Sequence, residues 1–404
     1  MSTPLGACLM GPVALMWVAA FGCHASSSRM DASANEDDNG GSGGGGHTSD
    51  AAVMRGGSGA GGPATPPSVR DGSVIDATRA GDSTTAEAPR LLPPAGKIVL
   101  FIGQDVDAIK GYASSVASTF DGFTTYTSIS ENAQGFVQLE GLSQLANQGG
   151  GNVFAQALAN TFPSAAVALG LYMVDHTGTN LEHVAGGTHD AAIDRLGDFL
   201  LSLQRPVFVR VGYEFDGTWN HYEPEPYKRA FRHISLRLRS KNTKLAFVWQ
   251  SATYGDGRYR NLPLSAWYPG DDVVDWFGSS YFKFTSKPHQ EMLAMAREHR
   301  KPLMIAEATP QGYDLTKLRS SSTGSRFDPK TGMQIWQEWF VPFFNFVYAN
   351  EDVIRAVAYI NTHWDAQPLW SPTAGNGYWG DSRVQANQTI LTAWKQELLK
   401  PTWR

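Results

Sequence analysis

From Lys97 onward, the chain alternates short apolar runs, rich in β-branched residues, with longer amphipathic stretches. Eight runs have the length of a strand: residues 97–103, 123–128, 165–174, 206–212, 244–250, 273–282, 302–307 and 354–360. Between them, residues 191–204, 224–239, 288–300 and 333–348 show the apolar spacing of helices. Eight strands alternating with helices predict an α/β fold, a (β/α)8 TIM barrel rather than an open doubly wound sheet.

Glycine motifs do not indicate a nucleotide-binding sheet. None of the eight runs is followed by GxGxxG, or by GxxxxGK with Ser or Thr after it. The glycine stretch NQGGGN around Gly149 follows a helical pattern instead of a strand, so we expect an ordinary loop there.

The first 94 residues differ in composition from the rest. Residues 24–94 contain no Phe, Trp or Tyr and run through NEDDNGGSGGGG, GGSGAGG and PATPPS. Such segments cannot bury enough apolar surface to offset chain entropy, so we expect a disordered linker over 24–94. The catalytic-sized domain is therefore expected to span residues 95–404 and to fold without the linker.

The linker is preceded by a signal-like segment. Residues 9–22 form an apolar run too short to span a bilayer comfortably, which is typical of a signal peptide over residues 1–23. The run ends in AAFGC, which resembles the lipidation box of bacterial lipoproteins and points to Cys23 as the lipidated residue. An exported surface or outer-membrane lipoprotein is thus expected, with plain secretion or a non-exported chain as the alternatives.

Charge and cysteine content argue against several binding partners and reaction types for the predicted barrel. From residue 95 onward there are 28 basic and 29 acidic residues, which gives no electrostatic reason to expect nucleic-acid binding and favours an uncharged substrate. Cys8 and Cys23 both precede the linker, so the predicted barrel has no thiol for a disulfide, zinc or a nucleophile. His176 and His363 end predicted strands as isolated residues, and no pair has H-E-x-x-H spacing, so no metal or cofactor is expected.

Two glutamates follow strands that should be buried on both faces. Glu214 lies just past the end of the fourth run, and Glu307 ends the seventh. Strand alternation puts Arg210, Gly212 and Glu214 on one side of their strand, and Leu303, Ile305 and Glu307 on one side of theirs. If those sides face inward, the carboxylates converge at the C-terminal mouth, where barrel enzymes carry their active sites. A carboxyl pair there predicts glycoside cleavage, whereas an ion pair or a helix cap is the structural alternative.

Three motifs resemble glycoside hydrolase family 26, the β-mannanase family of clan A. RPVFVRVGYEFDGTWNHY, at residues 205–222, resembles the fourth-strand pattern R-x-x-H-E-M-N-G followed by Trp. AWYPGDDVVDWFGSSYF, at residues 266–282, resembles the sixth-strand stretch, and KPLMIAEAT, at residues 301–309, resembles the seventh strand that ends in the nucleophile.

The resemblance implies a retaining mechanism with Glu214 as acid/base and Glu307 as nucleophile. It further implies that Tyr281 hydrogen-bonds the nucleophile and that Trp364, in INTHW, forms the aromatic floor under the sugar. Arg210 matches the family's arginine and is expected under the two carboxylates. Packed aromatic residues and a purely structural ion pair are the alternatives for these three positions.

The chain departs from the family at Tyr213, where the family has His, and at Phe215 and Asp216, where it has Met and Asn. Tyr213 is expected to contact the sugar and puts the substrate in doubt more than the reaction. Asp216 is expected to cap the next helix, or else to raise the pKa of Glu214. Trp219 is expected to form a sugar subsite. Other aromatic residues near strand ends are candidates for either core or sugar contacts: Tyr222, Trp249, Trp267, Phe282, Trp370 and Trp379.

The favoured function is a retaining endo-β-glycosidase acting on a neutral polysaccharide or oligosaccharide. β-Mannan is the favoured substrate, and β-1,3-xylan and β-glucan are the alternatives. A clan-A glycosidase with another glycan or exo cleavage, and a non-catalytic carbohydrate-binding surface lipoprotein, are the competing hypotheses. The membrane is expected as a partner only through a lipid at Cys23, and the sequence leaves the oligomeric state open.

Overall fold

The computed structural model describes residues 90–116, 120–131, 137–147, 149–173, 180–241, 244–254 and 259–403. The expected signal peptide with Cys23, the expected linker up to residue 89 and His176 lie outside these ranges.

Eight parallel strands close into a barrel. They are β1 (Val99–Gly103), β2 (Gly122–Ser128), β5 (Ala166–Tyr172), β6 (Val207–Val211), β7 (Leu245–Ser251), β8 (Trp276–Tyr281), β9 (Leu303–Ala308) and β13 (Ile354–Ile360). The order around the barrel is β1-β13-β9-β8-β7-β6-β5-β2. Each predicted strand is present, so the (β/α)8 fold class is confirmed.

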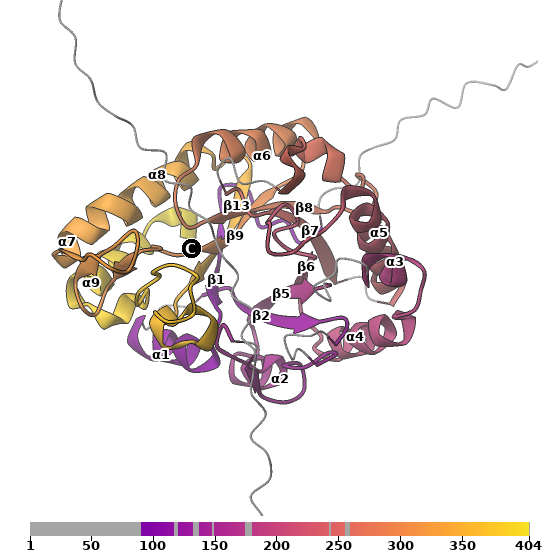
Figure 1. The fold of residues 1–404 in the computed structure, drawn as a ribbon, viewed down its shortest axis with the longest axis horizontal. Helices are drawn as coiled ribbons and strands as arrows, with labels where there is room; N and C mark the ends of the chain where they lie inside the picture. Colours follow the sequence, from indigo (N-terminus) through magenta and orange to yellow (C-terminus); the bar gives the residue numbers. More distant parts are fainter. Residues whose placement is uncertain are drawn as a thin grey trace, which may run out of the picture. The chain divides into compact units, whose positions relative to one another are not determined.

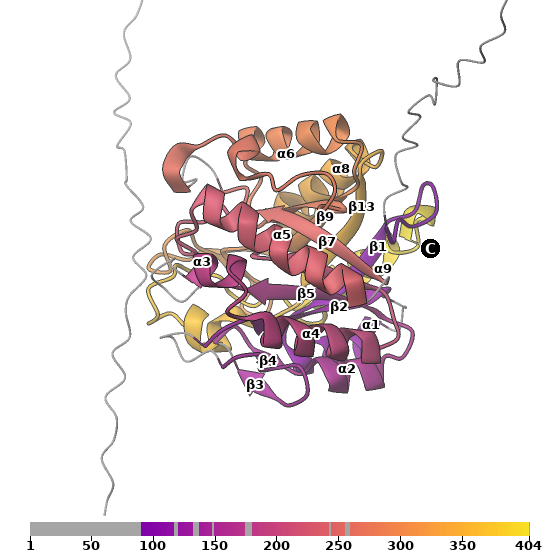
Figure 2. The same cartoon turned by 90° about the vertical axis from the view of Figure 1, so that its right-hand side faces the viewer.

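Helices surround the barrel (Figures 1 and 2). They are α1 (Val106–Val116), α2 (Ala155–Thr161), α3 (Asn180–Ala185), α4 (Asp190–Ser202), α5 (Pro224–Lys241), α6 (Ser286–Glu298), α7 (Gly332–Ile335), α8 (Val341–Ala349) and α9 (Gln388–Glu397). A π-helical turn, Trp336–Phe340, joins α7 to α8. Within the described ranges, no helix combines the length and apolar character needed to cross a membrane.

Side chains alternate between two apolar layers, as the strand period requires. Residues such as Phe101, Phe208 and Trp276 fill the barrel interior, where Phe208 contacts both other rings edge-on at 5.3 and 5.2 Å between centroids. Their neighbours along the strands, such as Ile102 and Phe277, pack in the larger layer with the helices.

The described chain begins before the expected boundary at residue 95. Leu91 packs against the interior layer, as Val99 and Ala166 at the starts of β1 and β5 also do. The buried indole nitrogen of Trp276 donates to the Arg90 carbonyl at 2.7 Å. Residues 90–94 therefore contact the core, although the sequence places them in the linker.

Two small sheets lie outside the barrel. The hairpin of β3 (Ala146–Asn147) and β4 (Asn152–Val153) flanks the glycine stretch at Gly149. The second sheet contains β10 (Tyr313–Asp314), β11 (Arg319–Ser320) and β12 (Asp328–Pro329). Both follow C-terminal ends of barrel strands, β2 and β9, so they can contribute to the mouth.

Candidate active site

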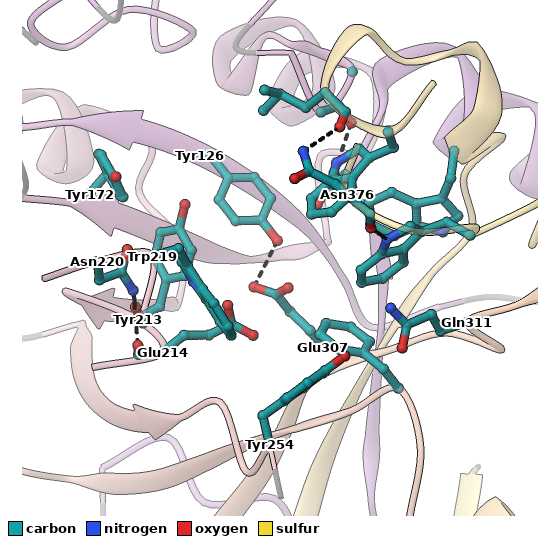
Figure 3. Close-up of a pocket in the computed structure, with 18 of the residues that line it drawn as sticks. Tyr126, Tyr172, Tyr213, Glu214, Trp219, Asn220, Tyr254, Glu307, Gln311 and Asn376 are labelled. Atoms are coloured by element: carbon teal, nitrogen blue, oxygen red, sulfur yellow. Dashed lines mark hydrogen bonds between the residues drawn. The ribbon is translucent and has the colours of Figure 1, made fainter. Parts of the chain in front are cut away.

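A pocket of about 260 Å³ is lined by residues near the C-terminal ends of the strands and in the segments that follow them (Figure 3). Glu214 and Glu307 both line it. Much of the remaining wall is aromatic: Tyr126, Tyr172, Tyr213, Trp219, Tyr254, Phe282, Trp364, Trp370 and Trp379. Flat apolar surfaces around two carboxylates suit a sugar, whose ring faces are apolar and whose edges are polar.

Glu307 reaches the pocket because of a β-bulge in β9. Ser279 and Ser280 are consecutive in β8 but pair with Ile305 and Glu307, so β9 contains one extra residue there. Ile305 packs in the helix-side layer, whereas Glu307 lines the pocket. The expectation that the two share a face is wrong, because the extra residue reverses the alternation.

Arg210 and Tyr126 hold Glu307. Arg210 is completely buried in the barrel, and its Nη1 donates to Glu307 Oε1 at 2.6 Å. The Tyr126 hydroxyl donates to the same oxygen at 3.1 Å. Within the part of the chain that the structure describes, both hydrogen bonds to the Glu307 carboxylate reach Oε1. Oε2 of Glu307 is therefore available to attack an electrophile in the pocket.

Glu214 enters the pocket from a turn and not from a strand. β6 ends at Val211, and Gly212 and Glu214 have φ angles of 53° and 54°. The pleat that would put Arg210, Gly212 and Glu214 on one side therefore stops before Glu214, and this expectation is wrong as well. The Asn220 side chain steadies the turn, because its Nδ2 donates to the Glu214 carbonyl at 2.9 Å.

Burial and charge both favour the protonated form of Glu214. Its side chain is 7% exposed, and Ser280 Oγ donates to its Oε1 at 2.7 Å. Desolvation raises the pKa of Glu214 most strongly, and the charges of Glu307 and Asp216 raise it further, against the opposing effects of Ser280 and Arg210. A carboxyl kept protonated near neutral pH is suited to act as a general acid.

Asp216 does not cap the next helix. Its oxygens accept from Ser251 Oγ and from the Ala252 backbone nitrogen, both at 2.7 Å, at the end of β7. It thus ties the turn carrying Glu214 to the neighbouring strand. The second role considered for it, raising the pKa of Glu214, agrees with the direction of its charge effect.

The tyrosine beside Glu307 is Tyr126 of β2, and the assignment of this contact to Tyr281 is wrong. Tyr281 packs among His289, Phe343 and Phe346 on the helix side of β8. Alternation from the inward-facing Trp276 explains this, because Ser280 then faces inward and Tyr281 outward. The hydrogen bond is supplied from across the barrel, a pairing that local sequence does not signal.

Gly170 makes room for this arrangement. A Cβ atom at Gly170 would lie 2.5 Å from the Tyr126 ring and 2.9 Å from Arg210 Nη2. The glycine in the β5 run therefore has a packing reason, which is the closest sequence signal to the role of Tyr126.

Residues 99–318 match the family model of glycosyl hydrolase family 26. This chain belongs to that family. The matched segment includes Glu214 and Glu307 and ends before Trp364.

Two relatives of the family 26 domain are β-1,3-xylanases. The protein TXYA of a Vibrio species is 39% identical over 323 residues, 77% of this chain and 66% of the relative. One from an Alcaligenes species is 38% identical over 323 residues, 77% of this chain and 65% of the relative. The chain thus spans 66% and 65% of the length of these relatives.

The structure of a fungal β-1,4-galactanase is also similar. It has 11% identity and a TM-score of 0.51, with 74% of this chain and 99% of that chain covered. At this identity the likeness supports the shared barrel fold alone.

The family 26 pocket brings together most of the expected aromatic residues. Trp364, 2% exposed, lines it and donates its indole nitrogen to Thr309 Oγ1 at 3.2 Å. Tyr213 and Trp219 also line it. Of the other candidates, Phe282, Trp370 and Trp379 line the pocket, whereas Tyr222, Trp249 and Trp267 are fully buried in the helix-side core.

Some polar residues of the pocket carry no recognisable sequence signal. Asn220 Oδ1 and Gln311 Oε1 are buried acceptors without a protein donor in the described part of the chain. Both residues line the pocket, although these two oxygens are themselves buried. His363 starts a 3₁₀ turn outside the pocket lining, and the described residues contain no cluster of three or more His, Cys, Asp or Glu suited to a metal.

Proposed function

We propose that this protein is a retaining endo-β-glycosidase that hydrolyses a neutral polysaccharide, with Glu214 as acid/base and Glu307 as nucleophile. The observation that carries the proposal is the unequal treatment of two buried carboxyls in one aromatic pocket. Glu307 is hydrogen-bonded to a fixed positive charge, while the pKa of Glu214 is raised by burial and by neighbouring negative charges. Environments that differ in this way assign a nucleophile and an acid.

In the first step, Glu307 Oε2 attacks the anomeric carbon while Glu214 gives its proton to the departing glycosidic oxygen. A covalent glycosyl ester forms on Glu307, and Glu214 becomes a carboxylate. In the second step, Glu214 takes a proton from water, whose oxygen attacks the same carbon and releases Glu307. Two displacements retain the configuration at that carbon, and the proton on Glu214 is restored.

The charges in the pocket change in step with this chemistry. While Glu307 is esterified, its negative charge is absent, and the rise that it causes in the pKa of Glu214 is removed. Glu214 then ionises more easily and can act as a base in the second step. One carboxyl thus serves as acid and then as base because its neighbour gains and loses charge.

We propose β-1,3-xylan as the substrate, in place of the β-mannan that the motifs favour. The support is the 39% and 38% identity to two β-1,3-xylanases, together with Tyr213 at the position where the mannanase pattern has His. Tyr213 packs edge-on against Tyr126, with 5.4 Å between centroids, and both rings line the pocket beside Glu307.

We also propose that the protein is exported and anchored through a lipid on Cys23.

The test is product release from β-1,3-xylan, β-1,4-mannan, β-1,3-glucan and mixed-linkage β-glucan by the full chain. The expected result is a series of β-1,3-xylo-oligosaccharides, which also indicates internal cleavage. Monomer alone would replace endo by exo cleavage, and hydrolysis of mannan alone would overturn the substrate. Binding to a glycan without hydrolysis of any would favour a carbohydrate-binding role.

A further inference from the structure

A buried series of hydrogen bonds connects the two carboxyls through Arg210, Gln250 and Ser280. Arg210 Nη1, which contacts Glu307, also donates to Gln250 Oε1 at 3.0 Å. Gln250 Nε2 donates to Ser280 Oγ at 3.1 Å, and Ser280 Oγ donates to Glu214 Oε1 at 2.7 Å. Gln250 and Ser280 are 0% and 1% exposed, so water does not compete for these bonds.

The direction of each bond follows from the chemistry of its donors. A guanidinium only donates, so the Gln250 oxygen must face Arg210 and its amide nitrogen must face Ser280. Ser280 Oγ accepts from that nitrogen, and its own hydrogen is then directed to Glu214. Glu214 Oε1 is therefore an acceptor, and the proton of the neutral carboxyl belongs on Oε2.

We propose that Ser280 and Gln250 are positioning residues that place the catalytic proton of Glu214 on Oε2. The inference rests on the proposed function, because only an acid that serves a leaving group needs its proton on one particular oxygen. A proton on Oε1 would face Ser280 and would be useless to the glycosidic oxygen. Arg210 thus acts on both carboxyls. It contacts Glu307 directly, and the side chains of Gln250 and Ser280 connect it to Glu214.

The backbone around the series is held in place as well. The Ser280 carbonyl accepts from Thr253 Oγ1 at 2.5 Å and lies 3.1 Å from His289 Nε2. Gly278 lets the strands approach, since a Cβ atom there would lie 2.9 Å from Gln250 Cβ. Positions fixed on both sides of β8 indicate that the Ser280 hydroxyl is preorganised toward Glu214.

The effect of Ser280 on the pKa of Glu214 must be distinguished from the effects of the charged groups nearby. Glu307 of β9, Asp216 of the same turn and Arg210 of β6 all act on it. None of these is changed when the Ser280 hydroxyl is removed. Because that hydroxyl favours the ionised carboxyl, its loss is expected to move the pKa of Glu214 to higher pH.

The first test compares Ser280→Ala with Ser279→Ala, a matched control on the same strand. Ser279 is also 1% exposed, but alternation turns it away from the barrel interior. The substrates are β-1,3-xylan and the 2,4-dinitrophenyl glycoside of β-1,3-xylobiose, whose leaving group needs no proton. Ser280→Cys, whose thiol donates weakly, is a second variant that largely preserves the packing.

Ser280→Ala is expected to lower kcat/KM for xylan by about 10- to 100-fold, as misplacement of a catalytic group does. For the dinitrophenyl glycoside, kcat/KM of Ser280→Ala should stay near the wild-type value. This ratio covers only the steps up to departure of the leaving group, and dinitrophenolate departs without a proton. Ser280→Cys should fall between, and Ser279→Ala should match the wild type. An equal loss with both leaving groups, or no loss on xylan, would overturn the role.

A second measurement does not depend on turnover. Titration of ¹³C-carboxyl-labelled glutamate by NMR, with Glu214→Gln to assign the signal, reports the pKa of Glu214 directly. The pKa should be higher in Ser280→Ala than in the wild type and unchanged in Ser279→Ala. If the wild type cleaves no glycan, the proposed function fails, and an unchanged titration in Ser280→Ala would separately overturn the positioning role.

Discussion

Replacing Tyr126 by Phe removes one hydroxyl and leaves the ring in place beside Arg210, whose guanidinium carbon lies 4.9 Å from the ring centroid. The lost bond to Glu307 Oε1 matters most in the second displacement, when the ester becomes a carboxylate again. A hydrogen bond contributes about 1.5–3 kcal/mol with a charged partner and about 0.5–1.5 kcal/mol with a neutral one. The departing carboxylate therefore gains about 1–1.5 kcal/mol from Tyr126, which corresponds to a factor of roughly ten in rate.

The assay is steady-state and rapid-mixing kinetics with the dinitrophenyl glycoside of β-1,3-xylobiose, for which release of the leaving group is fast. Tyr126→Phe should lower kcat about tenfold through slower hydrolysis of the ester, while the initial burst of dinitrophenol persists. KM should fall as well, because the covalent intermediate accumulates.

Tyr281→Phe is the matched control, since the motif resemblance assigns the contact to Tyr281 while the structure turns this residue toward α6 and α8. It should leave kcat and KM unchanged. A loss in Tyr281→Phe together with a normal Tyr126→Phe would refute the geometry around Glu307.

Three further predictions follow from the same structure. The pKa of Glu214 is raised in the folded state, so the contribution of Glu214 to the stability of the wild type is highest below the ordinary glutamate pKa of about 4.3 and falls as pH rises toward the folded-state pKa. Glu214→Gln has no such titration. In denaturant titrations it should therefore be more stable than the wild type at about pH 9 and equally stable at about pH 4. Removal of residues 1–94, compared with removal of residues 1–89, should lower the free energy of unfolding by about 1–3 kcal/mol, because the indole of Trp276 loses its acceptor at Arg90; equal unfolding midpoints would contradict this. Gly150→Ala should raise KM for xylan more than it lowers kcat, because the new Cβ would lie 2.9 Å from Gln104 Nε2 in the pocket wall; an unchanged KM would show that this wall does not touch the substrate.

The barrel was predictable because each of its strands is a buried run of strand length, made of apolar residues or, in β2, largely of threonine and aromatic residues. Periodicity also marked Arg210, Glu214 and Glu307 as polar residues that interrupt or end such runs. The structure brings Glu214 and Glu307 to one pocket and places Arg210, fully buried, beside Glu307.

The details that differ arise where the backbone leaves its regular period. The bulge in β9 reverses the alternation before Glu307, and the positive φ angles after β6 end the pleat before Glu214. Gly212 is a residue type that allows a positive φ angle, but neither Glu214 nor the residue types of β9 announce these changes. Contacts across the barrel, such as Tyr126 with Glu307, depend on strand order and register and are equally invisible to local spacing.

The contacts of residues 90–94 with the bottom of the barrel were also not predicted from the sequence. Composition places residues 90–94 with the linker because they contain no aromatic side chain. Their role depends on a backbone acceptor at Arg90 and on one apolar side chain, Leu91, which composition does not weigh.

The central claim is that Glu307 forms a covalent bond with the sugar, and trapping that bond tests it most directly. A 2-deoxy-2-fluoro glycoside of β-1,3-xylobiose with a dinitrophenyl leaving group slows hydrolysis of the ester, so the glycosyl enzyme should accumulate. Mass spectrometry of the digested protein is expected to show the added disaccharide on the peptide that contains Glu307, with none in Glu307→Gln. A label on another residue, or turnover of β-1,3-xylan to products of inverted anomeric configuration, would contradict the account.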